Sequence, residues 1–474
     1  MILVVLVYLC RLLPGVGGGT TSANSVDYSC LHASSWQINT NNYTNSRFNT
    51  KPDILSSRYT TSSSYTIQSM ASTSNAWQIG YNRIPNYDHT FTASEITTLN
   101  SRTNAASDFA VGGKTSAVEG SFYVFGSNVG YKTTSCSLGW WPPGPVCPTV
   151  SASTTTFPLM PLSETATTAN SAYPGCYVGA GQIGVWVTGA KIYGFGDGKG
   201  FRGIRAAGTY GSSANIDSNL ASWHNLAPVF EANDMDVCGG HAANGDYHHH
   251  SWPSCLAIKL NDYGASSHSQ IWGWIQDGLP LYGPWQAKNT LSKSCWAKRD
   301  YTSISGGGCS SVNGISNGRT CQLNNIYDLS ASTSTISNST FFGPYTTDTL
   351  TTQSRNTITA VSGVFLEDYF YNASCGSAGG ENLDSYNGHD HDSLGYHYHV
   401  TVDKTMTPTF PYLVGPKYKG CVKGSKCNAL PAAQSSAAFA TPKNGWTGGS
   451  TTGISSSVQS QVRRTQLLGL FEYT

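Results

Sequence analysis

The stretch Gly273-Trp-Ile-Gln-Asp-Gly-Leu-Pro-Leu-Tyr282 places apolar residues on both sides of an Asp277-Gly278 pair. An Asp-Gly pair suits the positive backbone φ of a two-residue turn, so the stretch predicts a β-hairpin. A glycine, an apolar run, a turn and an aromatic strand recur at residues 184–193 and 363–371, which predicts two similar hairpins. We expect Asp277 to form the turn, and its use near a metal ion is the alternative.

Outside the hairpins the chain consists of short β-prone pieces. Residues 64–68 and 121–125 are typical, and clusters of Ser, Thr, Asn and Gly separate such pieces. Few long stretches carry the 3.6-residue periodicity of an amphipathic helix. The sequence therefore predicts a mostly β protein, an antiparallel sandwich or a barrel-like fold with long loop insertions and little helix.

Charge and motifs exclude several classes of function. Charged residues make up only 11% of the 474 residues, and the 27 Lys and Arg nearly balance the 26 Asp and Glu. No basic run is present that would release counterions from a nucleic acid backbone, so nucleic acid is not an expected partner. The chain contains no Gly-x-Ser-x-Gly elbow, phosphate loop, dinucleotide glycine string or His-Glu-x-x-His helix. We therefore expect no nucleotide cofactor.

The N-terminus has the features of a secreted protein. Residues 1–14 are mostly apolar and small residues follow, which predicts a signal peptide over residues 1–21. Because Arg11 interrupts the apolar run and no Lys or Arg precedes it, a retained anchor is the alternative. No later stretch is long enough to span a bilayer, so we expect an extracellular protein without a membrane span once the signal is removed.

Cysteines and glycosylation acceptors agree with secretion. Loss of Cys10 with the signal peptide leaves twelve of the 13 cysteines, an even number that suits disulfides in an oxidising compartment. Three Asn-x-Ser/Thr tripeptides predict glycosylation at Asn42, Asn338 and Asn372.

Eight of the twelve histidines fall in two short windows, residues 238–255 and 389–399. Both windows follow one plan: an Asp, then Gly-His, a short polar turn and Tyr-His-x-His. Because side chains alternate along a strand, the two histidines of each His-x-His point to one face. Two such strands facing each other would gather four imidazoles in one site, and the Gly-His histidines would join them from the preceding turns.

Clustered neutral imidazoles are typical of zinc, copper and iron sites, so the windows predict a site for a divalent transition metal. The expected ligands are His241, His248, His250, His389, His397 and His399. Asp236, Asp277, Asp384, Tyr247 and Tyr396 are candidates for additional ligands or for groups that support the ligands. His249 should point away from its neighbours. In the alternative interpretation the histidines are ordinary sheet residues whose ring nitrogens bond to carbonyls and hydroxyls.

Cys238 and Cys255 bracket the first window. In a secreted chain we expect a disulfide between them that ties the turn to the end of the strand, and metal ligation by these cysteines is the alternative. Three histidines with an open position would suggest catalysis, and four closed ligands would suggest a structural ion. The sequence leaves both roles open, so it does not decide whether the protein is an enzyme.

At these residues the chain resembles the YHYH family, which is named for the string that stands intact at Tyr396-His-Tyr-His399. Further strings resemble the family in the same order, at residues 84–87, 184–193, 229–232, 268–269, 273–284, 363–368, 383–384, 387–388, 410–412 and 420–421. Their spread implies a single domain over residues 65–425. The resemblance also marks His268 as either a further ligand or a packing residue, and it implies no particular reaction.

The segments around and within this domain complete the expected organisation. They are a Ser/Thr/Asn-rich segment at 22–64, a Ser/Thr/Asn-rich insertion at 286–360 and a low-complexity tail at 426–474. The insertion departs most from the family pattern. Its cysteines predict a disulfide-tied excursion of its own, and they are Cys295, Cys309 and Cys321.

An alternative function is a module that binds a cell-wall or extracellular-matrix component. Exposed aromatic platforms would contact glycan in such a module, and the candidates are Trp252, Trp272, Trp274 and Trp285. Aromatic residues of this size more often pack in cores or interfaces. The metal content of the purified protein separates the two functions.

Overall fold

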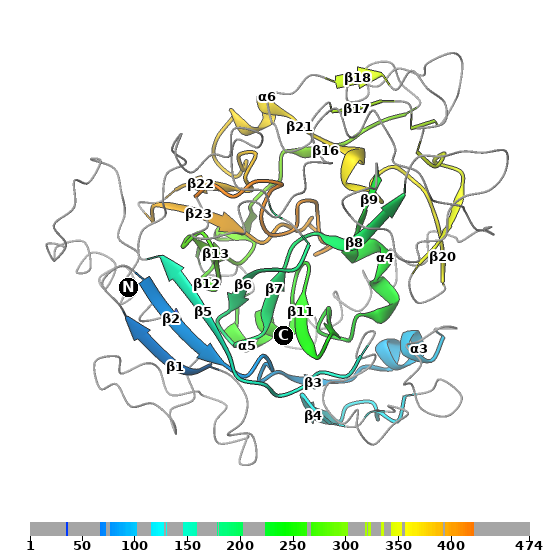
Figure 1. Cartoon of the computed structure of the whole chain (residues 1–474). Coiled ribbons are helices and arrows are strands. Elements are labelled where there is room, and N and C mark those ends of the chain that lie inside the picture. The colour runs from blue at the N-terminus through cyan, green and yellow to red at the C-terminus, as the bar shows by residue number, and fades with distance from the viewer. Residues whose placement is uncertain are drawn as a thin grey trace, which may run out of the picture.

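The largest element of the structure is an eight-stranded mixed sheet near the middle of the molecule (Figure 1). From one edge to the other it consists of β10 (Gly240–Ala243), β11 (Asp246–His249), β7 (Lys191–Tyr193), β6 (Gln182–Trp186), β12 (Ile271–Ile275), β13 (Pro280–Tyr282), β23 (Tyr396–His399) and β22 (Gly388–Asp390). This order places the two histidine windows at opposite edges of one sheet.

The structure is a computed structural model, and it describes residues 35–36, 67–72, 76–101, 115–127, 129, 146–158, 178, 180–201, 223–262, 267–301, 318–319, 321–323, 333–335, 343–352, 356–391 and 394–420. Several expectations lie outside these residues: the signal peptide at 1–21, nearly all of the segment at 22–64, the tail at 426–474, and glycosylation at Asn42 and Asn338. Within the described residues, no helix has the length and apolar character needed to cross a membrane.

The large sheet consists of two halves with the same strand arrangement. In the first half, hairpin β6–β7 pairs through β7 with the parallel strand β11 of hairpin β10–β11. In the second half, hairpin β12–β13 pairs through β13 with the parallel strand β23 of hairpin β22–β23. Antiparallel pairing of β6 with β12 joins the halves. Each half thus contains one glycine-containing hairpin and one histidine hairpin.

Glycines explain how the two hairpins β6–β7 and β12–β13 meet at the centre of the sheet. Their turns contain Gly189 and Gly278, each with a φ of 90°, a conformation that favours glycine. A Cβ on Gly184 would lie 2.3 Å from the carbonyl oxygen of Trp274. A Cβ on Gly273 would lie 2.8 Å from a side-chain carbon of the same sheet. The recurring glycine of the sequence pattern is therefore required by the close approach of β6 and β12.

The predicted hairpins at residues 184–193 and 273–282 are confirmed, but the one at 363–371 is wrong. This third segment folds into the 3-10 helix η7 (Leu366–Asp368) and the short strand β21 (Tyr369–Tyr371). The carboxylate of Asp368 accepts hydrogen bonds from the backbone N–H groups of residues 363–365, at 2.9, 3.1 and 3.0 Å. These bonds hold the backbone in a turn, so it does not extend into the first strand of a hairpin.

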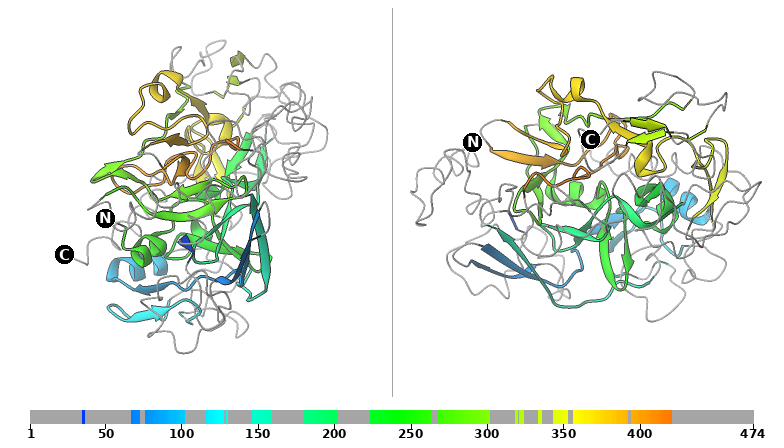
Figure 2. Two further views of the ribbon diagram at one scale, coloured as in Figure 1. Left: turned by 90° about the vertical axis from the view of Figure 1, so that its left-hand side faces the viewer. Right: turned by 45° about the horizontal axis from the view of Figure 1, so that its top comes forward.

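A three-stranded antiparallel sheet lies beside the large sheet (Figures 1 and 2). It consists of β1 (Ile67–Ser72), β2 (Ala76–Tyr81) and β5 (Ser153–Pro158). The two sheets share one apolar core, which includes Phe157 of β5, Trp186 of β6 and Trp274 of β12. Helix α5 (Ser254–Leu260) packs on the same core through Leu256.

Short elements surround the two sheets. Strand β3 (Asp88–Thr90) pairs with β4 (Phe122–Val124), and helix α3 (Ala93–Ser101) lies between them in the chain. The connection from β7 to β10 contains β8 (Gly196–Phe201), β9 (Trp223–Leu226), α4 (Ala227–Phe230) and the 3-10 helix η4 (Ala232–Asp234). The connection from β13 to β22 contains β14 (Trp285–Ala287), β15 (Thr290–Leu291), β16 (Trp296–Lys298), β17 (Cys321–Leu323), β18 (Thr333–Thr335), β19 (Thr349–Thr351), β20 (Thr357–Thr359), η7, β21 and α6 (Ala373–Gly376).

The insertion at residues 286–360 is joined to the rest of the protein at several points. Strand β16 pairs with β21, which follows the insertion, and β19 and β20 share a second apolar core with β9. Cys295 forms a disulfide with Cys375, at a Cα–Cα distance of 5.6 Å. The expected separate excursion is therefore wrong for Cys295, because its partner lies beyond the insertion. Cys309 and the side chain of Cys321 lie outside the described residues.

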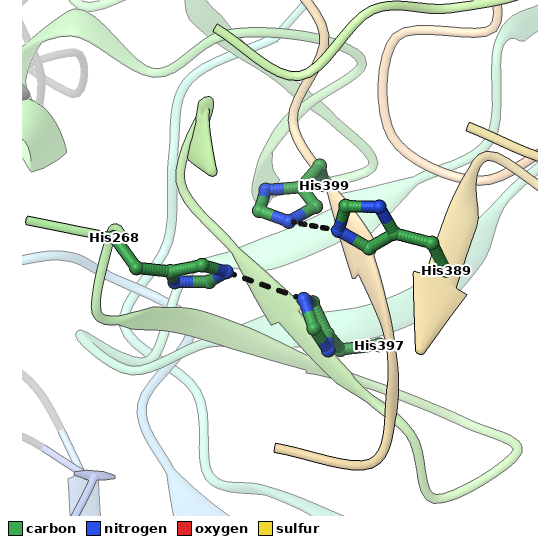
Figure 3. A group of neighbouring side chains, drawn as sticks. All are labelled: His268, His389, His397 and His399. Carbon is green, nitrogen blue, oxygen red and sulfur yellow. Dashed lines mark hydrogen bonds between the residues drawn. The ribbon is translucent and has the colours of Figure 1, made fainter. Parts of the chain in front are cut away.

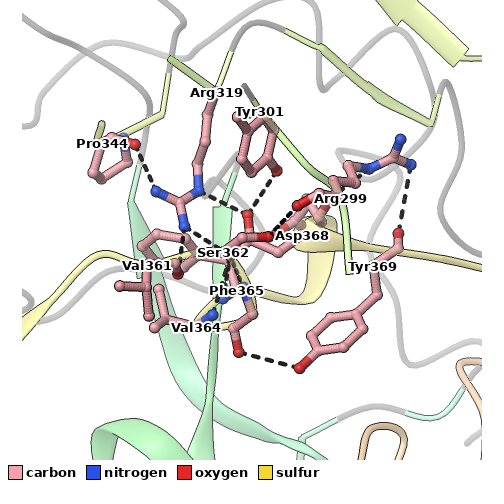
Figure 4. Close-up of polar contacts among 12 residues, drawn as sticks. Arg299, Tyr301, Arg319, Pro344, Val361, Ser362, Val364, Phe365, Asp368 and Tyr369 are labelled. Carbon is pink, nitrogen blue, oxygen red and sulfur yellow. Dashed lines mark hydrogen bonds and ion pairs between the residues drawn. The ribbon is translucent and has the colours of Figure 1, made fainter. Parts of the chain in front are cut away.

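A buried charge network holds the insertion in place (Figure 4). Asp368 accepts hydrogen bonds from Nε and Nη2 of Arg319 at 2.7 and 2.8 Å, and from the hydroxyl of Tyr301 at 2.7 Å. Arg319 also donates to the carbonyl oxygens of Pro344 and Val361 at 2.6 and 2.9 Å. Because Arg319 and Asp368 are fully buried, each charge depends on the other for compensation.

The prediction of a mostly β protein with little helix is confirmed. The large sheet is mixed and not purely antiparallel, because β7–β11 and β13–β23 are parallel pairs. A parallel pair needs a connection of a dozen residues or more, and the two long connections of this chain provide it. The described strands do not close into a barrel.

Candidate metal centres

The two histidine windows form two separate groups, one at each edge of the large sheet. Four strands lie between β11 and β23, so five inter-strand steps of about 4.8 Å place them roughly 24 Å apart. The expectation that the two His-x-His strands face each other in one site is therefore wrong. Each histidine hairpin pairs with the other hairpin of its own half, and the similarity of the two windows does not reveal this pairing.

The four-imidazole cluster consists of His268, His389, His397 and His399, each with a ring nitrogen within 4.8 Å of those of the other three (Figure 3). His268 Nε2 lies 3.3 Å from His397 Nε2, and His389 Nε2 lies 3.1 Å from His399 Nε2. Tetrahedral ligands at 2.0–2.1 Å from a zinc ion lie about 3.3 Å from one another. The closest pairs thus have the spacing of ligands to one ion.

Strand geometry brings three of these histidines together. His397 and His399 are two residues apart on β23, so their side chains point to the same face. His389 on β22 is paired directly with His397 across the hairpin. His268 comes from the segment just before β12 and reaches the same group (Figure 3). Local alternation therefore explains the pair on β23, whereas the tertiary fold adds His268.

Backbone carbonyls hold three of the rings by Nδ1. The bonds are His268 Nδ1 to Ser269 O at 2.7 Å, His397 Nδ1 to Gly395 O at 2.7 Å and His399 Nδ1 to Gly283 O at 2.6 Å. A carbonyl oxygen only accepts hydrogen bonds, so Nδ1 is the protonated nitrogen in each of these rings. In the neutral rings, Nε2 then presents a lone pair to the other members of the cluster.

Burial favours the neutral form of the two histidines on β23. His397 and His399 are fully buried, while His268 and His389 are partly exposed. Burial lowers the pKa of His397 and of His399 well below the usual value of 6.5, and neighbouring histidines lower both pKa values further. At neutral pH His397 and His399 therefore offer uncharged nitrogen donors, and the cluster is open to solvent at His268 and His389.

Asp384 and Tyr396 support the turn that carries His389. Asp384 accepts a hydrogen bond from the Tyr396 hydroxyl at 2.9 Å and from the backbone N–H groups of Tyr386 and Gly388 at 2.9 and 3.2 Å. Burial raises the pKa of Asp384. Both residues were expected near a metal, and the structure places them in the frame of the histidine hairpin.

Asp277 forms the turn of hairpin β12–β13, as expected for the Asp-Gly pair. Its carboxylate accepts hydrogen bonds from the backbone N–H of Leu279 at 3.1 Å, the hydroxyl of Tyr398 at 2.7 Å and the backbone N–H of Gly420 at 3.0 Å. Burial raises the pKa of Asp277 to about 6. Asp277 thus connects the hairpin to β23 and does not belong to either group of potential ligands.

The histidine–glutamate cluster, at the other edge of the sheet, consists of His241, His248, His250 and Glu231. Each histidine has a ring nitrogen within 4.8 Å of those of the other two. His248 Nε2 lies 3.0 Å from His250 Nε2, and Glu231 Oε2 lies 3.3 Å from His241 Nε2 and 3.2 Å from His250 Nε2. All four residues are buried, so this cluster is less accessible than the four-imidazole cluster.

Sequence reasoning did not single out Glu231, which the structure places beside His241 and His250. It directly follows α4, in a string that carried only the family resemblance, and no ligand spacing connects it with a histidine. Burial would raise the pKa of Glu231, but His241 and His250 lower it to about 2. Glu231 in turn raises the pKa of His241 against the effect of burial. The buried carboxylate therefore favours positive charge at the centre of this cluster.

The frame of the first histidine hairpin matches that of the second. Asp236 accepts hydrogen bonds from the Tyr247 hydroxyl at 2.8 Å and from the backbone N–H groups of Cys238 and Gly240 at 2.8 and 3.2 Å. Burial raises the pKa of Asp236 to about 7. His248 Nδ1 bonds to Asp246 O at 2.8 Å, and His250 Nδ1 bonds to Gly194 O at 2.5 Å. Asp236 and Tyr247 thus support the hairpin in the way that Asp384 and Tyr396 do.

Two other features of the first window agree with the predictions from the sequence. Cys238 and Cys255 form a disulfide with a Cα–Cα distance of 5.0 Å, which ties the turn before β10 to α5. These cysteines are therefore not metal ligands. His249 packs against the rings of Trp186 and Tyr247, at centroid distances of 6.0 and 5.1 Å, and does not belong to the cluster.

Three of the four tryptophans considered as glycan platforms are buried. Trp252 is 1% exposed, and Trp272 and Trp274 are 0% exposed. They belong to the apolar core, and only Trp285 is partly exposed. A sugar ring needs an accessible aromatic face, so these three residues pack in the core, as large aromatic residues more often do, and do not form the platform of the alternative function.

Comparisons with known proteins address the family of this chain. No curated protein and no solved structure matches it. The family model described as YHYH protein matches residues 154–415, which is more than half of the 474 residues. The match spans both histidine clusters and all eight strands of the large sheet. The chain therefore belongs to the YHYH protein family, as the string at residues 396–399 indicates.

Proposed function

We propose that this protein is a secreted metal-binding protein that holds a divalent transition-metal ion at His268, His389, His397 and His399. The observation that supports this most directly is the pair His268 and His397. Both rings donate from Nδ1 to backbone carbonyls, so their two Nε2 lone pairs face each other at 3.3 Å. Two lone pairs at this distance repel each other unless a cation lies between them.

A shared proton is the other cation that would relieve this repulsion. Burial opposes binding of this proton, because the pKa of His397 lies well below its usual value. A metal ion meets no such limit, since it binds the neutral form of each ring and is coordinated by all four nitrogens at once. The geometry therefore favours a metal ion over a proton at neutral pH.

The donor set indicates the class of metal. Imidazole nitrogens suit zinc, copper and iron, and the closest nitrogen pairs fit tetrahedral coordination of zinc. Hydrogen bonds from Nδ1 to backbone carbonyls are the usual support of metal-binding histidines, because they set the tautomer and the ring orientation. The partial exposure of His268 and His389 gives an ion access to this site.

Secretion is the second part of the proposal. The disulfides Cys238–Cys255 and Cys295–Cys375 suit an oxidising compartment. Asn372, one of the predicted glycosylation acceptors, is exposed. Expression in a secreting eukaryotic cell tests this part: the mature chain in the medium should begin after residue 21 and lose mass on deglycosylation. An intracellular chain that begins at Met1 would contradict it.

Metal analysis tests the first part. Purified full-length protein is loaded with Zn²⁺, freed of excess ion by gel filtration and analysed for zinc. His268→Ala and His389→Ala replace the partly exposed ligands, and each should lower the zinc content by one equivalent without loss of the circular dichroism spectrum. His391→Ala is the matched control, because this ring stacks on His389 at 5.1 Å but lies outside the cluster. Equal zinc contents in all four proteins would overturn the proposal.

A further inference from the structure

The histidine–glutamate cluster lies too far from the four-imidazole cluster to share an ion with it. We infer that Glu231, His241, His248 and His250 hold a second divalent ion of the zinc class, which stays bound as a structural ion while the ion at the four-imidazole cluster exchanges. This site goes beyond the proposed function, because neither cluster contributes a ligand to the other.

The first observation is the tautomeric state of His248 and His250. Each ring donates from Nδ1 to a backbone carbonyl, at 2.8 Å for His248 and 2.5 Å for His250. In the neutral rings, their Nε2 atoms therefore present lone pairs to each other, at a distance of 3.0 Å. The two rings need a cation between them, as His268 and His397 do.

The second observation is the state of His241. Its side chain is 1% exposed, yet among the described residues Nδ1 has no hydrogen-bond partner and Nε2 has only an ion-pair contact with Glu231. Buried polar groups are almost always satisfied, so an imidazole in this state indicates a missing partner. Its Nε2 faces Glu231 Oε2 at 3.3 Å, and its ring centroid lies 4.6 Å from that of His248. A metal ion among these groups would give the lone pair of Nε2 a partner.

The third observation is the repetition of the whole frame. Both hairpins have an Asp that accepts from a Tyr hydroxyl, a direct cross-strand pair of histidines, and a last histidine whose Nδ1 bonds to a glycine carbonyl. The pairs are His241 with His248 and His389 with His397. Gly194 and Gly283 provide the carbonyls. A frame that orients imidazoles toward a common point at one edge therefore does so at the other.

The fourth donor distinguishes the two sites chemically. At the four-imidazole cluster it is the neutral ring of His268, so a divalent ion there keeps its full charge. At the histidine–glutamate cluster it is the carboxylate of Glu231, which neutralises one charge of the ion. Imidazole nitrogen and carboxylate oxygen are both zinc ligands, and the oxygen donor disfavours soft copper(I). The buried site therefore suits zinc.

Burial separates the two sites kinetically. All four residues of the histidine–glutamate cluster are buried, and the disulfide Cys238–Cys255 ties the turn before β10 to α5. The four-imidazole cluster has two partly exposed ligands. A chelator in solution should reach the ion of the four-imidazole cluster long before the ion of the buried site.

The test is the zinc content of full-length protein before and after dialysis against a chelator. Wild-type protein should bind two equivalents and keep one after dialysis. Glu231→Gln, which preserves the size of the side chain and removes its charge, should abolish the chelator-resistant equivalent and leave the labile one. His389→Ala should do the reverse, which makes it the matched control at the other edge.

Each outcome separates this inference from the proposed function. One equivalent that disappears in His389→Ala and persists in Glu231→Gln would overturn the inference and leave the proposed function intact. One equivalent with the opposite behaviour would support the inference and overturn the proposed function. No bound zinc would overturn both.

A measurement on the wild-type protein covers the case in which Glu231→Gln does not fold. Anomalous diffraction at the zinc edge from crystals of the zinc-loaded protein should show a peak about 2.0–2.2 Å from His250 Nε2 and from Glu231 Oε2. A peak at the four-imidazole cluster alone would overturn the inference.

Discussion

The two edges of the large sheet use one frame to present different donors. At both edges an Asp carboxylate accepts a hydrogen bond from a Tyr hydroxyl, and a glycine carbonyl orients the last histidine of His-x-His. The fourth donor is Glu231 at one edge and His268 at the other, and both lie outside the repeated hairpins. The hairpins thus position the imidazoles, whereas a separate segment determines the charge of the fourth side chain in each cluster.

The edges also differ in how they are supported. A disulfide braces the first histidine hairpin, whereas the second follows the long connection that contains the Asp368 network. In the sheet, His249 is paired with Ile192 in the first half, and Tyr398 is paired with Leu281 at the same position of the second half. Tyr398 donates to a buried carboxylate, while His249 lies among aromatic rings. Each of these differences can be tested by a separate substitution.

The largest effect is expected from the network that precedes the second edge. Asp368→Asn leaves the buried charge of Arg319 without its partner, so it should lower the free energy of unfolding by about 3–5 kcal/mol. Urea denaturation followed by circular dichroism measures this loss. If the network supports the second half, zinc at the four-imidazole cluster should be released at a lower urea concentration than zinc at the histidine–glutamate cluster.

Glu381→Gln is the control for this variant, because Glu381 is exposed and its replacement should change the unfolding free energy by less than about 0.5 kcal/mol. An effect of Asp368→Asn as small as that of the control would contradict a supporting role for the network.

Removal of the brace at the first edge should have the next largest effect. The double variant Cys238→Ser, Cys255→Ser opens a loop with a sequence separation of 17 residues. The greater freedom of the unfolded chain should lower the free energy of unfolding by about 3 kcal/mol. The measurement is the urea midpoint, together with the rate at which a chelator removes zinc. Faster removal only at the four-imidazole cluster would show that the disulfide does not protect the first edge.

The two Asp–Tyr pairs allow a matched comparison of the frames. Tyr247→Phe removes a hydrogen bond to the buried carboxylate of Asp236. At pH 8 this should lower the free energy of unfolding by about 2 kcal/mol. Tyr396→Phe removes the equivalent bond to Asp384, whose side chain is 33% exposed, so water replaces part of it and the cost should be nearer to 1 kcal/mol. Thermal or urea unfolding of both variants measures the two losses in the free energy of unfolding. A larger cost at Tyr396 would reverse this ranking of the two frames.

The smallest effect concerns acid sensitivity at His249. Burial lowers the pKa of His249 well below 6.5, so the folded protein binds fewer protons here than the unfolded chain. The contribution of neutral His249 to the free energy of unfolding is fully present above about pH 6.5. This contribution is lost as the pH falls toward the pKa of His249 in the folded protein. His249→Phe should change the unfolding free energy at pH 7.5 by less than about 1.5 kcal/mol and reduce its loss between pH 7.5 and pH 5.

Urea midpoints at the two pH values measure this difference. Val118→Thr is the control, because this side chain is 59% exposed and carries no titratable group, so its replacement should leave the pH dependence unchanged. An identical loss of stability on acidification in His249→Phe and wild type would show that His249 does not contribute to acid sensitivity.

Local patterns of the sequence determined the parts of each half. The Asp277-Gly278 turn, the glycine of each central hairpin and the alternation of His-x-His are properties of neighbouring residues, and all three predict the observed strands. The disulfide Cys238–Cys255 was also predictable, because both cysteines bracket one short window. The same approach failed at residues 363–371, where the side chain of Asp368 bonds to the backbone and forms a turn.

Only the tertiary structure decided how these parts are arranged and which residues complete the sites. The sheet separates the two histidine hairpins to opposite edges because each adds in parallel to a strand that lies far away in the sequence. Glu231 and His268 join the clusters through packing of segments that share no spacing with His-x-His. The repeated motif therefore determined the orientation of the imidazoles, while long-range packing decided that they form two clusters with different fourth members, since no local period encodes contacts between distant segments.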